Sequence, residues 1–415
     1  MDHPDEPERL TTEQVAWRLG VKPETVYAYV SRGVLHSVRG SDGRGSLFDA
    51  AEVDRLVAGG KRGRRTGGQG PVIRTALTLI SGGRLSYRGR DATDLARTHT
   101  FETVAHWLWT ERFDPEVRFA GAADVVGLAR TAIAALPPGV LSVDRLRLIA
   151  GVAASVDPLR FTTEADAVAA TGANLLGVLV DALPLVGIEP RDDPAGLRLA
   201  DRLWPRLTAE PAHPAGLAAL NGALVLLADH DLAASTLAAR VAASTRAHPY
   251  AVVAAGLSAS EGPLHGLAAG YAYRLLADAM TTGDPIGVYS EALRRQGHVT
   301  GFAGRPHRFY PDGDPRAAAL LDLITPVPAV DGARAAIDGL LEAARRRSPQ
   351  LPTVDFALAA LAHTCRMSAD AGEAIFAIAR TAGWLAHAME EYREPGLRFR
   401  FVGTYSGHPP PTADR

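Results

Sequence analysis

The chain has 415 residues, of which 47% are apolar, and it carries a formal net charge of −2 with a pI near 6.7. This length exceeds one ordinary hydrophobic core, so two or three structural units are expected. The apolar content excludes a disordered chain, and the charge excludes bulk binding of nucleic acid by the whole chain, though not a local basic patch. The single cysteine, Cys365, excludes an intramolecular disulfide or a cysteine-cluster metal site and fits a reducing compartment.

Two segments bear on where the protein works. The first ten residues, MDHPDEPERL, are acidic and lack the apolar stretch of a secretory signal. The most apolar run, residues 168–188, contains Asn174, Asp181 and Pro184, so we interpret it as a buried helix rather than a membrane span. We therefore expect a cytoplasmic protein with no membrane partner.

Residues 8–58 predict a small winged helix-turn-helix domain. Thr11 and Gln14 have the spacing of a capping box at the start of a first helix, and Pro23 is placed to open a second helix. Residues 35–49 then predict a strand, a glycine-rich turn and a second strand, before a third helix. This order resembles the DNA-binding module of MerR-like regulators and excisionases.

In such a module the second helix enters the major groove of DNA. The candidates for contacts with phosphates or base edges are Thr25, Tyr27, Tyr29, Ser31 and Arg32 on the second helix, and Arg39 and Arg44 on the wing. The alternative is that this domain only packs on the next one or mediates assembly. Its acidic and basic residues are about balanced, which weighs against DNA binding.

The following segment, residues 59–70, predicts a linker. Its six glycines do not hold a helix, and its four basic residues will be solvated. It serves either as a soluble spacer or as a source of additional phosphate contacts.

The remainder, residues 71–415, predicts an all-α body. Long segments of Ala, Leu and Val are punctuated by Pro, Gly and Asp. Residues 80–91 predict one short hairpin. The pattern contains no glycine-rich phosphate loop and no metal-ligand spacing, so neither a nucleotide-phosphate loop nor a metal centre is expected.

Two histidines in this body lie where helices end or begin. His230 follows an apolar, buried helix and is flanked by Asp229 and Asp231, which suits a partner for an anionic ligand or a carbonyl oxygen. His265 follows Gly262 and Pro263 and is expected to begin a helix, where an imidazole is kept neutral. A neutral imidazole can donate a hydrogen bond to a developing oxyanion. Each histidine, taken alone, is as well explained as a structural residue.

A proline-rich segment, residues 304–321, holds a third histidine and an arginine. We expect His307 on a rigid loop and Arg316 in the first turn of the helix that follows. A rigid loop that holds charged groups suggests a binding site, although a surface loop is the simpler alternative.

Two further charged residues are predicted to lie in apolar surroundings. Asp355 opens an apolar helix, where partial burial would raise its pKa toward that of a general base. Arg380 lies on a helix that is apolar on both sides, beside Phe376 and His387, and needs a carboxylate partner that a ligand can supply. A carboxylate base with imidazoles suits enolisation next to a carbonyl, whereas buried arginines suit recognition of a dicarboxylate.

The order of these motifs resembles the citrate synthase family of the bacterial citrate and 2-methylcitrate type. The matching segments are ALTLISGGRLSYRGRDATDLA, ADHDLAAST, GPLHG, DGDPRA, VDF, ARTAGWLAH and the ending from Arg400 to Tyr405-Ser-Gly. They cover residues 71–407 in the family's order. The resemblance implies an all-α homodimer with a large domain and an inserted small domain at about residues 265–370, preceded by the winged helix-turn-helix domain.

The resemblance also implies a reaction: condensation of oxaloacetate with an acyl-CoA, followed by hydrolysis of the thioester. Coenzyme A thioester would be a substrate, with no bound cofactor and no metal. Asp355 would remove the α-proton of the acyl group, His265 would stabilise the enol oxygen and His307 would polarise the ketone. The implied oxoacid ligands are His230, Arg316, Arg380 and, from the partner subunit, Arg400.

The chain departs from the family's pattern at three places. His265 is followed by Gly-Leu-Ala-Ala instead of Gly-Gly-Ala-Asn, and His307 is preceded by Gly-Arg-Pro instead of Gly-Phe-Gly. The ending keeps only the first arginine of Arg-Pro-Arg, Arg400. Two functions therefore stay open: a condensing enzyme that makes citrate or 2-methylcitrate, and a DNA-binding regulator whose synthase-like body senses a di- or tricarboxylate or an acyl-CoA. A carbon-acid base at Asp355 favours the enzyme, and the helix-turn-helix favours the regulator.

Overall fold

The computed structural model describes residues 9–19, 21–39, 46–50, 52–53, 73–188, 196–262, 265–303, 309–330, 332–347 and 350–400. These residues fall into two compact units, one before residue 74 and one from Arg74 onward. The predicted linker, residues 59–70, lies outside the described residues, so its bounds stay a prediction.

The N-terminal unit has two short helices and a three-stranded sheet. Its elements are β1 Arg9–Thr11, α1 Thr12–Leu19, α2 Pro23–Ser31, β2 Ser37–Arg39 and β3 Ser46–Asp49. The two helices, the strand pair β2–β3 and helical residues at positions 50, 52 and 53, where a third helix is expected, are as the sequence predicts. The sequence pattern missed β1, which is too short to alternate and pairs antiparallel with β3 to give the order β1-β3-β2.

The capping box that opens α1 is confirmed. The Thr11 backbone N–H donates to Gln14 Oε1 at 2.8 Å, and the Gln14 N–H donates to Thr11 Oγ1 at 3.3 Å. Gly33 follows the end of α2 and has φ +68°. This left-handed backbone conformation favours glycine and stops the helix. A small core that includes Val15, Val26 and Phe48, each fully buried, holds this unit together.

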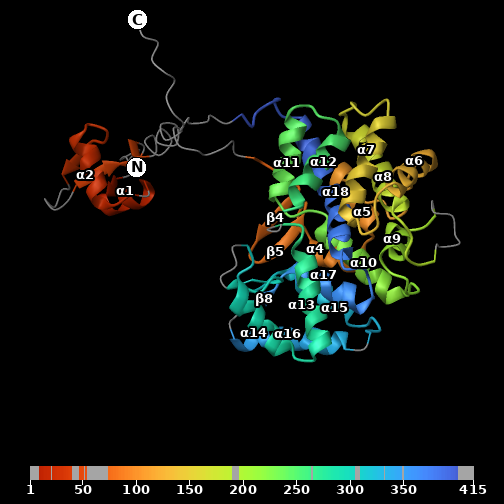
Figure 1. Cartoon of the computed structure of the whole chain (residues 1–415). Coiled ribbons are helices and arrows are strands. Elements are labelled where there is room, and N and C mark those ends of the chain that lie inside the picture. The colour runs from red at the N-terminus through yellow and green to blue at the C-terminus, as the bar shows by residue number, and fades with distance from the viewer. Residues whose placement is uncertain are drawn as a thin grey trace, which may run out of the picture. The chain divides into compact units, whose positions relative to one another are not determined.

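The second unit is almost entirely helical (Figure 1). Its elements are β4 Thr78–Ser81, β5 Arg84–Tyr87, β6 Arg90–Asp91, α4 Ala92–Thr98, α5 Phe101–Thr110, α6 Ala123–Ala134, α7 Ser142–Val156, α8 Ala165–Ala182, α9 Leu199–Leu207, α10 Pro214–Leu227, α11 Ala234–Ser244, α12 Pro249–Ser260, α13 Ala268–Thr282, α14 Pro285–Gln296, β7 Phe302–Ala303, α15 Pro315–Ile324, α16 Ala333–Arg347, β8 Leu351–Pro352, α17 Val354–Thr364 and α18 Ala371–Tyr392. The predicted hairpin is present as β4 and β5, and a third strand that the sequence did not indicate, β6, pairs with β5.

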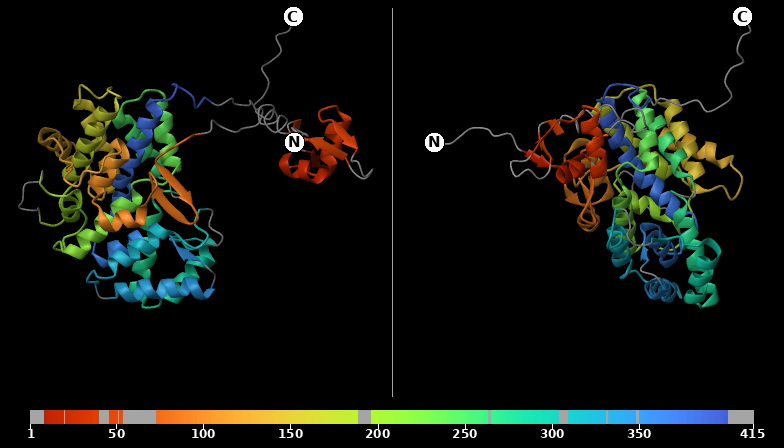
Figure 2. Two further views of the ribbon diagram at one scale, coloured as in Figure 1. Left: turned by 180° about the vertical axis from the view of Figure 1, so that it is seen from behind. Right: turned by 90° about the vertical axis from the view of Figure 1, so that its left-hand side faces the viewer.

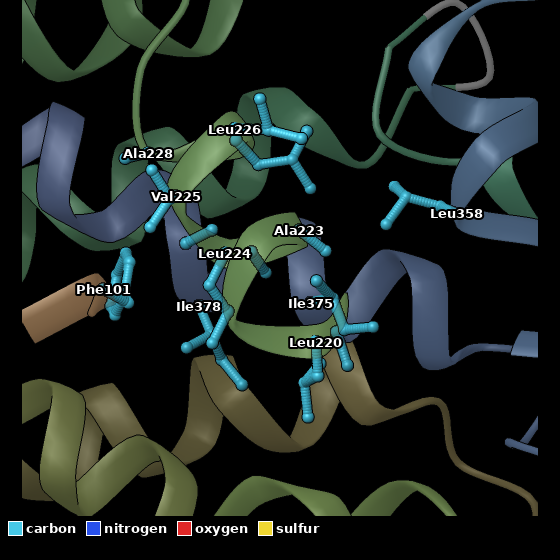
Figure 3. Close-up of a cluster of buried hydrophobic side chains, with 14 of the residues drawn as sticks. Phe101, Leu220, Ala223, Leu224, Val225, Leu226, Ala228, Leu358, Ile375 and Ile378 are labelled. Carbon is cyan, nitrogen blue, oxygen red and sulfur yellow. The ribbon is translucent and has the colours of Figure 1, made fainter. Parts of the chain in front are cut away.

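Helices α13 to α17 gather at one end of this unit, and the remaining helices form the other end (Figures 1 and 2). α18 and α10 both join the two groups: α18 packs on α11, α12, α5 and α8 and also on α13 and α17, and α10 packs on α4, α5 and α9 and also on α15 and α17. α10 is buried at the centre, as its apolar sequence predicts. Figure 3 shows Leu220, Leu224 and Leu226 of α10 among side chains from its neighbours, including Ile375 and Ile378 of α18. This packing fixes the segment that carries His230.

The apolar run at residues 168–188 forms α8 and the turn after it. By length and composition α8 is the one described helix that would suffice to cross a bilayer, and 61% of it is buried against other helices. It packs on α5, α6, α7, α9 and α18, so its apolar face is used in the core, as expected for a buried helix.

Candidate active site

Five of the predicted site residues converge between α10, α15, α17 and α18. Arg316 lies within electrostatic reach of Asp355 and of Arg380, and Arg380 lies within reach of His265. Tyr310 connects His230 to the group. Its hydroxyl lies 2.8 Å from His230 Nε2, and the centre of its ring lies 5.8 Å from the guanidinium carbon of Arg316. Residues up to 150 positions apart in the chain therefore share one site.

Asp355 is the second residue of α17 and is half-buried. Burial raises the pKa of its carboxyl, against the opposing effect of the Arg316 charge and of a hydrogen bond that Thr353 Oγ1 donates at 3.1 Å. The pKa shift has the direction that the sequence analysis predicted for a general base.

Arg316 is held by its neighbour Asp314, which caps α15. Arg316 Nε donates to Asp314 Oδ1 at 3.0 Å and Nη2 donates to Oδ2 at 2.8 Å. Burial acts to lower the pKa of the Arg316 guanidinium, but the Asp314 carboxylate outweighs it and holds the pKa above its ordinary value. Asp314 also accepts the Val354 N–H at 3.2 Å, so a single carboxylate orients both the arginine and the start of the helix that carries Asp355.

Arg380 lies on α18 and is 1% exposed. Its Nε donates to the Leu227 carbonyl oxygen at 2.8 Å, and its guanidinium lies 4.8 Å from the centre of the Phe376 ring. Among the described residues, no carboxylate forms an ion pair with it. Burial lowers its pKa. A buried guanidinium without an ion-pair partner is the feature that the sequence analysis associated with a carboxylate ligand.

His265 lies in a turn, and the prediction that it begins a helix is wrong. α13 begins at Ala268, three residues later, because the chain first folds back on the end of α12: the Gly266 N–H donates to the Ser260 oxygen at 2.8 Å. A Cβ at Gly266 would lie 2.3 Å from that oxygen, so glycine is required there. The pKa of His265 is nevertheless lowered, by burial and by the Arg380 charge rather than by a helix terminus.

The sequence analysis missed several neighbours of the histidines. Ser235 Oγ lies 2.8 Å from His265 Nε2, and the Phe376 ring meets the His265 ring edge to face at 5.5 Å. Tyr310 contacts His230 as described above. Ser235 lies within the quoted segment ADHDLAAST and Asp314 within DGDPRA, so the motifs contained a signal for both, but only the tertiary contacts give their roles.

Asp229 does not pair with its neighbour His230. It is buried, and its carboxylate accepts hydrogen bonds from Thr78 and from His387 Nε2, the latter at 3.2 Å. Burial acts to raise its pKa, but His387 and Arg380 hold the pKa below its ordinary value. Its role is therefore to fix the segment before His230.

Three predicted residues stand apart from this group. His307 lies outside the described residues. Arg400 is exposed at the end of the described chain, and no described contact joins it to the other five. Arg44 of the N-terminal unit is also outside the described residues. Among the described residues, no group of His, Cys, Asp or Glu side chains is placed to hold a metal ion.

In the N-terminal unit, Thr25, Tyr27 and Tyr29 lie on α2, with Ser31 at its end and Arg32 as its C-cap, and Arg39 ends β2. Tyr27 is 57% exposed, and Ser31, Arg32 and Arg39 are also exposed. Tyr29 packs partly on the core of the unit. The exposed face of α2 and the wing therefore offers a phenol and two guanidiniums to a partner.

Comparison with known families gives two matches. The model described as "Citrate synthase, C-terminal domain" matches residues 68–400, and the model described as "Helix-turn-helix domain" matches residues 9–61. "Citrate synthase 2" of Bacillus subtilis is 28% identical over 349 residues, which covers 78% of this chain and 91% of that protein. "2-methylcitrate synthase 1" of Corynebacterium glutamicum is 26% identical over 358 residues, covering 78% of this chain and 89% of that protein.

Solved structures show the same fold. A citrate synthase from Pyrobaculum aerophilum has a TM-score of 0.67 at 21% identity and covers 90% of this chain and 95% of its own. A citrate synthase from Thermoplasma acidophilum, in a ternary complex with carboxymethyl coenzyme A and oxaloacetate, has a TM-score of 0.63 at 22% identity and covers 83% of this chain and 95% of its own.

Proposed function

Since the chain belongs to the citrate synthase family and is a citrate synthase-type enzyme, we propose that it condenses oxaloacetate with acetyl-CoA or propionyl-CoA and releases citrate or 2-methylcitrate and CoA. The observation that carries this proposal is the half-buried Asp355 with its raised pKa, set beside two buried arginines. Both acyl-CoAs stay open, because one methylene in a pocket is worth about 1–3 kcal/mol.

In the proposed first step, Asp355 removes a proton from the α-carbon of the acyl-CoA, and the electron pair moves onto the thioester oxygen. His265, whose pKa is lowered, is neutral and donates a hydrogen bond to that oxygen. Ser235 fixes the orientation of the imidazole. The resulting enolate, stabilised by that hydrogen bond, is the nucleophile.

In the second step, the α-carbon of the enolate attacks the ketone carbon of oxaloacetate, and His307 protonates the ketone oxygen. Arg380 and Arg316 bind the two carboxylates, with His230 on the oxoacid as well and Arg400 reaching in from the partner subunit of a homodimer. Water then hydrolyses the thioester and releases CoA. The chemistry is supplied by side chains and substrates alone.

The test is thiol release from acetyl-CoA and propionyl-CoA in the presence of oxaloacetate. We expect Asp355→Asn to lower turnover by about 10²–10⁴-fold, the usual contribution of a positioned general base. Asp338→Asn, an exposed carboxylate on α16, is the matched control and should leave turnover unchanged. Equal turnover in Asp355→Asn and wild type would contradict the proposal, and the ratio of rates with the two acyl-CoAs identifies the substrate.

A second function is favoured by the N-terminal unit, whose exposed α2 and wing match a helix-turn-helix family. In this alternative the unit binds DNA and the synthase-like body senses a di- or tricarboxylate or an acyl-CoA. Fluorescence anisotropy with fragmented genomic DNA tests it: Arg32→Ala and Arg39→Ala should each reduce the salt slope by about one. Binding that is unaffected by both variants contradicts a role for this face.

Absence of turnover in the wild type, with oxaloacetate or citrate still raising the Tm, would favour the regulator over the enzyme. Turnover without DNA affinity would leave the N-terminal unit a role in assembly only. The two experiments are independent, because they address different units of the chain.

A further inference from the structure

Glu373, in the first turn of α18, is a half-buried acidic group that the proposed reaction does not use. Its Oε2 atom is buried and has no hydrogen-bond partner among the described residues. It lies on the face of α18 that also carries Phe376 and Arg380, since residues three and four apart share a helix face. Phe376 contacts both His265 and Arg380, so this face runs from the oxoacid arginine past the enol-stabilising histidine to Glu373.

The Glu373 side chain fills the point where α13 crosses α18. A Cβ added to Gly270 of α13 would lie 2.5 Å from Glu373 Oε1. In the reverse direction, a Cβ added to Gly372 of α18 would lie 2.8 Å from the Cβ of Ala269. Each helix therefore uses a glycine to receive a side chain of the other, and any change in the Glu373 side chain is transmitted to the first turn of α13.

The first turn of α13 follows directly on the turn that carries His265. Four residues separate His265 from Gly270, and the Gly266 N–H ties the turn to α12. A shift of α13 relative to α18 therefore moves His265 relative to Phe376 and Arg380. Placement within about 0.5 Å decides whether catalytic groups act together.

We propose that Glu373 is a positioning residue whose carboxyl, when protonated, seats α13 on α18 and thereby sets the position of His265 relative to Arg380. When the carboxyl ionises, a charge is left at a helix crossing where one of its oxygens has no partner, which costs free energy and loosens the crossing. The inference rests on the proposed function only for its activity readout.

The charge balance around Glu373 supports this proposal. The charged groups that face it are Asp370 at the N-cap of α18, Arg274 on α13 and Asp144 on α7. Burial first, and then the negative charges of Asp370 and Asp144, raise the pKa of Glu373 to about 7, against the opposing charge of Arg274. The carboxyl therefore changes its charge near neutral pH.

The first test uses amide hydrogen exchange of the α13 segment between pH 6 and pH 8, corrected for the intrinsic pH dependence of exchange. In the wild type, we expect exchange in residues 265–275 to accelerate several-fold above pH 7. Glu373→Gln keeps the shape of the protonated carboxyl, so exchange should stay slow at both pH values. The control is Glu342→Gln on α16. Glu342 forms ion pairs with Arg345 and Arg346 at the surface, and the variant should behave as the wild type.

The second test measures kcat/KM over the same pH range. The wild type should lose activity as pH rises through about 7 and Glu373→Gln should not. If Glu373→Gln does not fold, Asp370→Asn serves in its place, because it removes a neighbouring negative charge. The midpoint of the pH dependence of hydrogen exchange and that of kcat/KM should then both move to lower pH.

Identical pH profiles in the wild type, Glu373→Gln and Asp370→Asn overturn the proposal. If the wild type has no turnover but its exchange still depends on Glu373, the proposed enzymatic function fails while the positioning role stands. If the wild type turns over but neither its activity nor its exchange depends on Glu373, the positioning role fails while the proposed enzymatic function stands.

Discussion

The two halves of α18 bury charge in different ways. Its C-terminal half meets Arg240, which is fully buried and forms ion pairs with two carboxylates: its Nη1 lies 2.7 Å from Glu390 Oε2 and its Nη2 lies 3.1 Å from Glu391 Oε2. Its N-terminal half carries Arg380, which is equally buried but has no ion-pair partner among the described residues. Burial alone therefore does not distinguish Arg240 from Arg380, whereas their ion-pair partners among the described residues do.

The paired half forms a chain of contacts toward the candidate site. Arg240 Nη1 donates to His387 Nδ1 at 2.8 Å, which leaves His387 Nε2 to donate to Asp229, next to His230. On the other side, Arg398 donates to both oxygens of Glu391 at 2.6 Å, two residues before Arg400. This half of α18 thus fixes the chain next to His230 and close to Arg400, two residues that we propose bind the oxoacid.

The largest expected effect is a loss of stability when the ion pairs of Arg240 at the C-terminal half of α18 are removed. Arg240→Met removes the cation that Glu390 and Glu391 share and leaves Glu391 with Arg398 as its remaining ion-pair partner among the described residues, so the free energy of unfolding should fall by up to about 3–5 kcal/mol. Urea denaturation measures this effect, and Arg345→Met on the exposed face of α16 is the control. A change below 1 kcal/mol would mean that Glu391 is satisfied by Arg398 alone.

Replacing Arg380, in the N-terminal half of α18, by Met should affect ligand binding rather than stability. Arg380→Met removes a buried charge that has no carboxylate partner, so stability should be unchanged or higher. Oxaloacetate binding should weaken by about 2–5 kcal/mol, because the ligand carboxylate would be left unpaired. Calorimetric titration with oxaloacetate measures the second effect. If Arg380→Met were less stable than the wild type but bound oxaloacetate normally, Arg380 would be a structural arginine, contrary to this prediction.

The pH dependence of Asp355 sharpens the comparison between paired and unpaired groups. Because burial raises its pKa in the folded state, its contribution to stability is present below its ordinary pKa and is lost as pH rises through the folded value. Asp355→Asn should therefore have a higher Tm than the wild type at pH 7, and the difference should shrink toward pH 4. Activity should show the opposite trend, because the base acts only when ionised, so kcat/KM should fall as the pH is lowered through the raised pKa.

The smallest expected effect concerns the hydroxyl beside His265. Ser235→Ala removes one hydrogen bond to the imidazole, worth about 0.5–1.5 kcal/mol, and should lower kcat/KM by about two- to twelvefold. Ser155→Ala, an exposed hydroxyl on α7, is the control. A larger loss of activity would show that Ser235 does more than orient the ring.

The sequence by itself determined the helical class, the buried α10 and α8, the two-helix and wing order of the N-terminal unit, and the identity of the family. These features follow from local causes: apolar periodicity, capping side chains such as Thr11 and Gln14, and the order of short motifs along the chain. The environments of Asp355 and Arg380 also followed from the sequence, because each lies inside an apolar helix whose burial it shares.

The tertiary structure decided what depends on contacts between distant segments. The turn at His265 is set by the Ser260 oxygen rather than by helix propensity, and the Asp314 carboxylate that holds both Arg316 and the start of α17 joins segments 40 residues apart. The strands β1 and β6 exist only through their partners β3 and β5. The distinction between Arg240 and Arg380 is of the same kind, because a guanidinium's partners come from the fold and not from its own helix.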